Sequence, residues 1–165
     1  MAYEILVADY RNPAHAEALA TLLAAYSADP MGGGEALPEA HCLRAAQALA
    51  DFGNAFTVLA FTAEGEIREP VGLVNCLVSF STFSLKPLIN IHDFFVAGHC
   101  RGTGLANRLL DEVAREAGVR GCTKLTLEVL NNNIPAKKLY SRFGFAPYEL
   151  SPGAGAAEFW QMYLT

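Results

Sequence analysis

The spacing of apolar residues divides the first third of the chain into a strand and two helices. Tyr3–Asp9 alternates between apolar and polar positions as a strand does, and apolar residues recur at helical spacing over 13–27, after the candidate cap Asn12. Three successive glycines then interrupt regular structure within Asp29–Glu35. We expect a mobile loop there, followed by a second helix that begins near Pro38.

The middle of the chain is rich in Val, Phe, Thr and Leu, the residues that favour strands. Ala55–Thr62 and Pro70–Thr82 predict two antiparallel strands joined by a turn at Ala63–Glu66. Leu88–Ala97 predicts another strand, and apolar residues at helical spacing follow from 105 to 117. This part of the chain therefore predicts a hairpin followed by a strand–loop–helix unit.

The last part of the chain also combines strands with a helix. Lys124–Leu130 predicts a strand, Asn133–Phe143 a short helix, and Phe145–Glu149 and Glu158–Leu164 two closing strands. No internal repeat, charge block or interdomain linker divides the chain, which favours one domain over residues 1–165. The expected fold is mixed α/β, with a central, mostly antiparallel, twisted sheet of about seven strands flanked by about four helices.

Composition narrows the possible partners. The apolar runs are too short to span a bilayer and the N-terminus lacks the features of a secretory signal, so we expect a soluble, cytoplasmic protein with no membrane partner. The formal charge of −5 disfavours nucleic acid and suits a cationic acceptor. The four cysteines form no CxxC pair and no metal-ligand spacing with the histidines, so we expect structural thiols and no metal.

The segment from His92 to Asn107 joins an apolar strand to a helix through small residues. Gly102 and Gly104 permit backbone conformations closed to other residues, and the first N–H groups of the helix favour an anion. A pyrophosphate fits this turn, with Arg101 adding charge. The P-loop pattern fails because no Gly-Lys-Ser/Thr follows, and the G-x-G-x-x-G pattern fails because Asn107 replaces its third glycine. A glycine turn without a ligand is the structural alternative.

Two motifs resemble those of the GNAT superfamily of acetyltransferases. Arg101-Gly102-Thr103-Gly104-Leu105-Ala106 resembles its R/Q-x-x-G-x-G/A loop, and Asn133 to Phe145 is similar to its N-x-x-A-x-x-L-Y-x-x-x-G-F pattern. The resemblance covers about Leu88–Tyr148 and implies a GNAT fold with acetyl-CoA as cosubstrate. The residues implied to bind CoA, the first two through their main chain, are Phe95, Val96, Arg101, Gly102, Thr103, Gly104, Leu105, Ala106 and Asn133.

The same resemblance suggests how acetyl transfer is catalysed. Tyr140 matches the general acid that protonates the CoA sulfur, a role open to a phenol because it keeps its proton at neutral pH; a core aromatic is the alternative. Adjacent strand residues point to opposite faces, so at most one of His92 and Asp93 faces the acceptor directly. We favour His92 as the base, since its position resembles one where polyamine-type GNATs carry an acidic residue. A histidine bonded within the sheet is the alternative.

The acceptor is expected to be a small-molecule amine, with a protein or peptide amine as the alternative. Tyr26 and Glu35, at the glycine-rich loop, and Asp93 are the candidates for its recognition, although a solvated Glu35 is an open alternative. Two other classes remain: a non-catalytic CoA-binding sensor, and a nucleotide-binding domain that uses Gly102–Gly104 for ATP or NAD. The apolar segment Phe159–Leu164 offers a strand edge for a homodimer.

Overall fold

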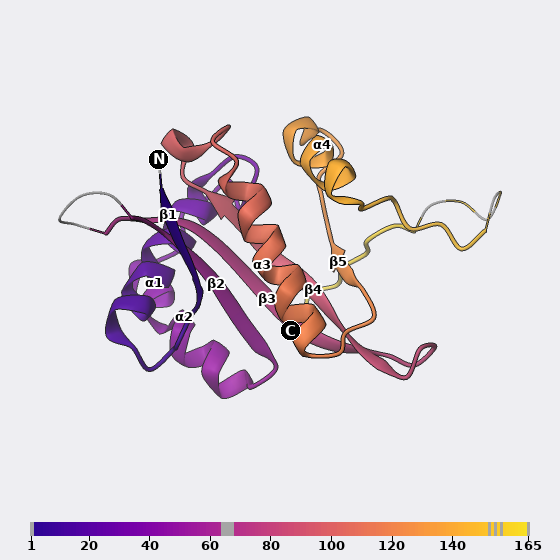
Figure 1. Cartoon of the computed structure of the whole chain (residues 1–165), viewed down its shortest axis with the longest axis horizontal. Coiled ribbons are helices and arrows are strands. Elements are labelled where there is room, and N and C mark those ends of the chain that lie inside the picture. Colours follow the sequence, from indigo (N-terminus) through magenta and orange to yellow (C-terminus); the bar gives the residue numbers. More distant parts are fainter. Residues whose placement is uncertain (1, 64–67, 152, 154, 156, 165) are drawn as a thin grey trace. The chain divides into compact units, whose positions relative to one another are not determined.

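The computed structural model describes residues 2–63, 68–151, 153, 155 and 157–164 of the chain (Figure 1). It forms two compact units, Met1–Leu127 and Glu128–Thr165. The first unit contains β1 (Tyr3–Val7), α1 (Pro13–Ala28), α2 (Glu39–Phe52), β2 (Ala55–Thr62), β3 (Pro70–Ser81), β4 (Lys86–Val96), the 3₁₀ turn Gly98–Cys100, α3 (Leu105–Val119) and β5 (Leu125–Leu127). The second contains α4 (Ile134–Phe143).

The five strands of the first unit form one sheet in the order β1-β2-β3-β4-β5. The first three pairings are antiparallel and β4–β5 is parallel, which confirms the mostly antiparallel sheet. A parallel pair needs a crossover between its strands, and α3 supplies it. Most of the turn predicted at Ala63–Glu66 lies outside the described residues.

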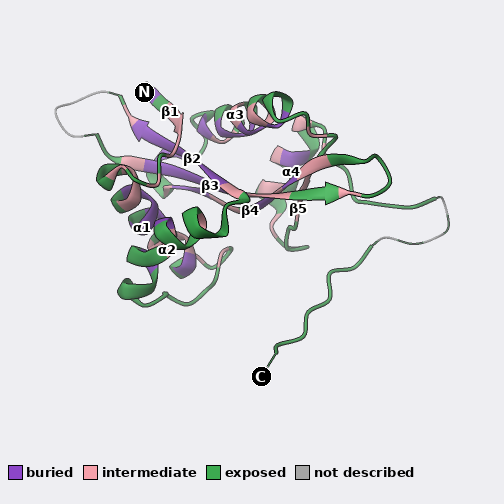
Figure 2. Cartoon of the chain, turned by 90° about the horizontal axis from the view of Figure 1, so that it is seen from below, coloured by how far each residue is buried: buried purple, intermediate pink, exposed green. Residues whose placement is uncertain are grey.

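Helices cover both faces of this sheet (Figure 2). On one face, Leu19 of α1 and Ala46 of α2 pack against Leu73 and Phe95 of β3 and β4. On the other face α3 lies so close that a Cβ added at Gly72 would stand 2.9 Å from the Leu109 side chain. We call the first of these the α1/α2 face; two of the candidate acceptor residues, Tyr26 and Asp93, lie on it.

Strand β4 carries a bulge at His92. Asp93 pairs with Asn75 of β3, but the next β3 residue, Cys76, pairs with Ile91, so His92 is an extra residue with no partner across the ladder. Paired residues share a face of the sheet. Asp93 therefore lies on the α1/α2 face, and the alternation that separates His92 from Asp93 in a regular strand does not apply here.

The second unit confirms the predicted helix and corrects the number of strands. The Asn133 side chain accepts a hydrogen bond from the Ala136 N–H at 3.2 Å, and α4 ends at Gly144 with a φ of 111°. The two closing strands predicted at Phe145–Glu149 and Glu158–Leu164 do not form among the described residues, where Glu149 makes only an isolated bridge. An apolar, alternating segment forms a strand only where another strand pairs with it, and among the described residues no strand pairs with these two segments. No helix among the described residues is long and apolar enough to cross a membrane.

Candidate active site

The turn between β4 and α3 contains several backbone N–H groups that have no backbone acceptor among the described residues. Gly102 and Gly104 have φ angles of 79° and 87°, in the left-handed region that favours glycine. Within the described part of the chain, no backbone partner accepts from the N–H groups of Gly102, Thr103 or Gly104. The first N–H groups of α3, from Leu105 and Ala106 onward, also lack partners inside the helix. These groups together form a site suited to an anion.

The Thr103 side chain connects this turn to strand β1 of the sheet. Its hydroxyl donates to the Cys100 carbonyl at 2.7 Å and accepts from the Tyr3 hydroxyl of β1 at 2.9 Å. Both bonds are internal, so a contact between Thr103 and a phosphate would come from its backbone N–H. The side chain holds the turn in shape.

Arg101 is tied to the loop that follows α1. Its Nε donates to the Val96 carbonyl at 3.0 Å, and its Nη2 donates to Asp29 Oδ2 at 2.7 Å. The guanidinium also lies 5.9 Å from the centre of the Phe95 ring. Arg101 therefore links the candidate pyrophosphate turn to the glycine-rich loop that the sequence predicted for acceptor recognition.

Tyr26 lies where that loop meets β4. Its ring centroid is 6.1 Å from that of Phe95. Burial raises the pKa of the Tyr26 hydroxyl, and the negative charges of Asp93 and Asp29 raise it further. A Cβ at Gly32 would stand 2.1 Å from the Tyr26 carbonyl oxygen, so glycine is needed at that position for the loop to pack here.

Hydrogen bonds hold the loop that the glycines predicted to be mobile. The Asp29 carbonyl accepts from the N–H groups of Gly32 and Gly34, and its Oδ1 accepts from the Met31 N–H. Leu37 donates its N–H to the Ser27 hydroxyl at 3.0 Å. The glycines permit this tight folding, and the segment contains neither helix nor strand.

His92 and Asp93, the two candidate residues at the bulge, differ in exposure and in hydrogen bonding. His92 is exposed, whereas Asp93 is half-buried and its Oδ2 accepts from Asn75 Nδ2 at 2.9 Å. Neither Asn75 nor Asp29 was among the sequence candidates. Asn75 had a visible signal, because it is one polar residue inside the apolar run Val71–Leu77. Asp29 had no signal, because its ion pair joins positions that are 72 residues apart.

Backbone direction distinguishes Phe95 from Val96. The Ala97 N–H bonds to Val71 of β3, so the backbone groups of Ala97 and, two residues earlier, Phe95 face β3. Those of Val96 face the opposite edge, where its carbonyl accepts from Arg101. Strand β5 pairs with β4 only from Ile89 to Ile91, so no described strand occupies that edge at Val96. A main-chain contact with a ligand is therefore open to Val96 and not to Phe95.

The remaining candidates are not brought into this group. Glu35 is exposed. Tyr140 and Asn133 belong to the second unit, where the Tyr140 ring lies edge-on to Phe145 with centroids 5.8 Å apart. The first unit thus assembles Tyr26, Asp93, Val96 and Arg101 around the end of β4.

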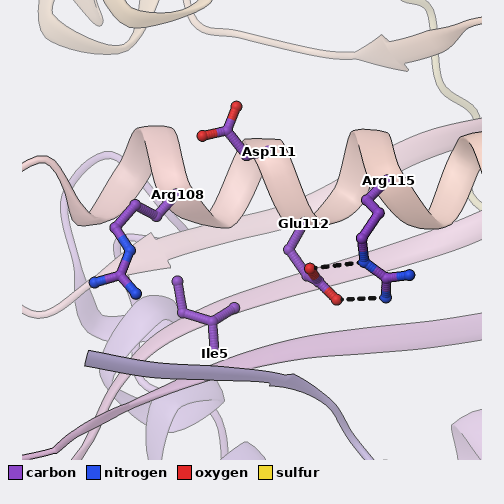
Figure 3. A pocket seen from close by; sticks show the side chains of 5 residues that line it. All are labelled: Ile5, Arg108, Asp111, Glu112 and Arg115. Carbon is purple, nitrogen blue, oxygen red and sulfur yellow. Dashed lines mark hydrogen bonds and ion pairs between the residues drawn. The ribbon is translucent and has the colours of Figure 1, made fainter.

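A hollow of about 380 Å³ lies elsewhere in the first unit, between β1 and α3 (Figure 3). Ile5 lines it together with charged residues of α3, and Arg115 forms two hydrogen bonds with Glu112. Arg108 donates to the Tyr3 carbonyl. None of the sequence candidates lines this hollow. In the described parts of the chain, no group of three or more His, Cys, Asp or Glu side chains could hold a metal ion.

Comparison with known proteins identifies a family. The model of the acetyltransferase (GNAT) family matches residues 20–145. The uncharacterized N-acetyltransferase YhfO of Bacillus subtilis (strain 168) is 34% identical over 48% of this chain and 54% of its own. The probable spermine N(1)-acetyltransferase of Bacillus subtilis subsp. natto (strain BEST195) is 33% identical over 47% of this chain and 59% of its own, so the match spans little more than half of these relatives. A crystal structure of a probable acetyltransferase superposes with a TM-score of 0.80 at 19% identity, covering 98% of each chain.

Proposed function

The chain belongs to the GNAT acetyltransferase family, and from this premise we propose that it transfers the acetyl group of acetyl-CoA to a primary amine of a small cationic molecule. The observation that carries the proposal is the arrangement around one strand. The end of β4 presents a carboxylate, Asp93, and leads directly into the cluster of backbone N–H groups at Gly102–Ala106. Both reactants can therefore be held by neighbouring parts of the first unit.

On the CoA side, the anion site at the start of α3 supports pyrophosphate binding. The N–H groups of Gly102, Thr103 and Gly104 have no backbone acceptor among the described residues, and the helix dipole adds a partial positive charge. The N–H of Val96 faces the open edge of β4, where it can polarise the thioester carbonyl. We assign this role to Val96 alone, since the backbone of Phe95 faces β3.

On the acceptor side, negative charge supports a cationic substrate. Asp93 and Asp29 both act on Tyr26, and the whole chain has a formal charge of −5. Asp29 is neutralised by Arg101, which leaves Asp93 as the carboxylate for an ammonium group. The relative named as a probable spermine N(1)-acetyltransferase is consistent with this choice.

In the proposed mechanism the amine attacks the thioester carbonyl directly. The C–N bond forms, the C–S bond breaks and the amine proton passes to His92. Tyr140, through its match to the general acid of the GNAT motif, donates a proton to the departing sulfur and regains one from water. His92 is exposed, so a proton that it takes can pass on to water. The path uses no covalent acetyl-enzyme and none of the four cysteines.

The test follows thiol release by purified protein from acetyl-CoA with a panel of polyamines, aminoglycosides and peptide amines. We expect turnover with at least one cationic small amine. Tyr140→Phe should lower kcat at least about tenfold, which corresponds to about 1.4 kcal/mol of transition-state stabilisation. Tyr148→Phe, which removes the hydroxyl of an exposed tyrosine from the same unit, should retain activity.

Other results would identify the alternatives. Turnover with peptides and not with small amines would make the acceptor a protein. Thermal stabilisation by acetyl-CoA without thiol release from any amine would favour a sensor. Stabilisation by ATP or NAD and not by acetyl-CoA would contradict the proposal.

A further inference from the structure

Four polar side chains form a hydrogen-bonded line across the α1/α2 face of the sheet. The hydroxyls of Tyr10 and Thr57 are 2.9 Å apart, Thr57 Oγ1 is 2.6 Å from Asn75 Oδ1, and Asn75 Nδ2 is 2.9 Å from Asp93 Oδ2. Thr57 is 0% exposed and Asn75 is 4% exposed. The last three are direct cross-strand partners on β2, β3 and β4.

The surroundings of this line are apolar. Leu59, Leu73 and Phe95 lie two residues from Thr57, Asn75 and Asp93 on the same strands and belong to the core of this face. Tyr10 packs against that core. Polar side chains that lose water in such a place are tolerated when each has a partner, and here the chain of bonds supplies one to each.

The chemistry of the four groups fixes the direction of the bonds. A carboxylate only accepts, so Asn75 must turn its NH₂ toward Asp93 and its carbonyl oxygen toward Thr57. The Thr57 hydroxyl then donates its one hydrogen bond to that carbonyl oxygen and accepts a hydrogen bond from the Tyr10 hydroxyl. Every donor in the line therefore points toward Asp93, although this carboxylate is three bonds away from Tyr10.

We propose that Thr57 and Asn75 are positioning residues that orient the Asp93 carboxylate for the ammonium group of the acceptor. Asn75 occupies Oδ2, and among the described residues no hydrogen bond occupies Oδ1, which is left for the cation. Thr57 acts one step further away, because it keeps the Asn75 amide from turning its oxygen toward the carboxylate. This inference rests on the proposed function, in which Asp93 binds the amine.

The decisive variant is Thr57→Val, which keeps the shape of the side chain and removes the hydroxyl. We expect the KM for the cationic amine to rise about fivefold, equivalent to about 1 kcal/mol, with the KM for acetyl-CoA unchanged. Thr57→Ser restores the hydroxyl and should return the KM for the amine to within about twofold of the wild type. Tyr10→Phe should have a smaller effect than Thr57→Val, since the Thr57 proton stays on Asn75.

A double-mutant cycle separates positioning from general damage to the core. If Thr57 acts through Asp93, Thr57→Val should raise the KM for the amine in the wild type and have little further effect in Asp93→Asn. Asn75→Leu, which removes the donor itself at similar volume, provides a second cycle should Thr57→Val fold poorly. Calorimetric acetyl-CoA binding by each variant checks that the fold is intact.

The outcomes distinguish this inference from the proposed function. A wild type that acetylates no amine overturns the proposed function before any variant is compared. If the wild type is active but Thr57→Val leaves the KM for the amine unchanged, the positioning role is overturned. The same holds if Thr57→Val raises this KM equally in the Asp93→Asn background. In both cases the proposed function still stands.

Discussion

Among single residues, Asp29 makes the ion pair with Arg101 that joins two loops of the first unit. The hydrogen bond from Arg101 holds the pKa of the Asp29 carboxyl below its usual range, helped by the Met31 N–H. A carboxyl with a lowered pKa in the folded protein contributes stability above its unfolded pKa and loses it as the pH falls through the folded pKa. The pair is partly exposed, so its contribution is that of a surface ion pair.

Asp29→Asn should therefore lower the free energy of unfolding by about 0.5 kcal/mol near pH 7. The difference from the wild type should shrink as the pH falls below about 3.9, the ordinary value for a carboxyl. Urea denaturation at pH 7 and pH 3 measures it. Asp51→Asn is the matched control, since Asp51 is exposed and bonds the neutral Gln47 amide. A difference that stays constant between the two pH values would contradict the charge effect.

The residues found from the sequence are those whose chemistry is local. Asn133 caps α4, and the glycines of the turn take left-handed conformations, because these features depend on a few neighbouring positions. Tyr26 and Asp93 were chosen from the sequence and do lie on one face. The partners Thr57 and Asn75 depend on the register of three strands, which no local pattern fixes.

Among the elements, the turn before α3 has the most specific backbone requirement. Gly104 has a φ of 87° and would meet nothing within 4 Å if it carried a Cβ, so the cost of a side chain there comes from the backbone alone. Gly104→Ala should lower the free energy of unfolding by about 1–2 kcal/mol, the cost of a left-handed L residue.

Gly98→Ala provides the control for that prediction. Gly98 belongs to the same connection, has equal space around it and does not have a positive φ. We expect the stability of this variant to stay within about 0.5 kcal/mol of the wild type in urea denaturation. Equal stability of the two alanine variants would show that the turn does not need the left-handed conformation.

Apolar periodicity predicted the helices and strands correctly wherever the structure gives them another element to pack against or pair with. The bounds of β2 match the predicted Ala55–Thr62, and the four helices found among the described residues are those expected. The bulge at His92 was missed because an extra residue in a strand leaves the composition unchanged while it moves side chains to the other face. Asp93 keeps the regular register that runs from Gly72–Val96 to Asn75–Asp93 and so shares a face with Phe95, whereas the bulge changes the placement of His92 and of the residues before it.

For the whole molecule, the sequence was informative about CoA and less so about the acceptor. The motifs that suggest CoA binding are short stretches of chain, and the conformation of each depends largely on its own local sequence. Recognition of the acceptor depends on the meeting of α1, its loop and β4, and Asp29 and Arg101 illustrate this because they are remote in sequence. The strength of the acceptor proposal therefore lies in tertiary contacts and not in motifs.

Assembly of the molecule is the last property that the sequence suggested. The segment Phe159–Leu164 is exposed, with Trp160 83% and Leu164 87% accessible, and it pairs with no strand among the described residues. Apolar residues gathered on an exposed, extended segment mark a surface for association. We propose that this segment pairs with a second copy of the chain to form a homodimer.

Trp160 is the one tryptophan of the chain, so its fluorescence reports on this segment directly. Light scattering should give twice the chain mass of 17.7 kDa, and Trp160 emission should shift to shorter wavelength as concentration rises, because dimerisation removes the ring from water. Trp160→Glu should return the mass to that of one chain, whereas Phe83→Ser, at another exposed aromatic residue on the turn after β3, should leave the dimer intact. A mass of one chain at every concentration, with unchanged emission, would show that the segment does not mediate self-association.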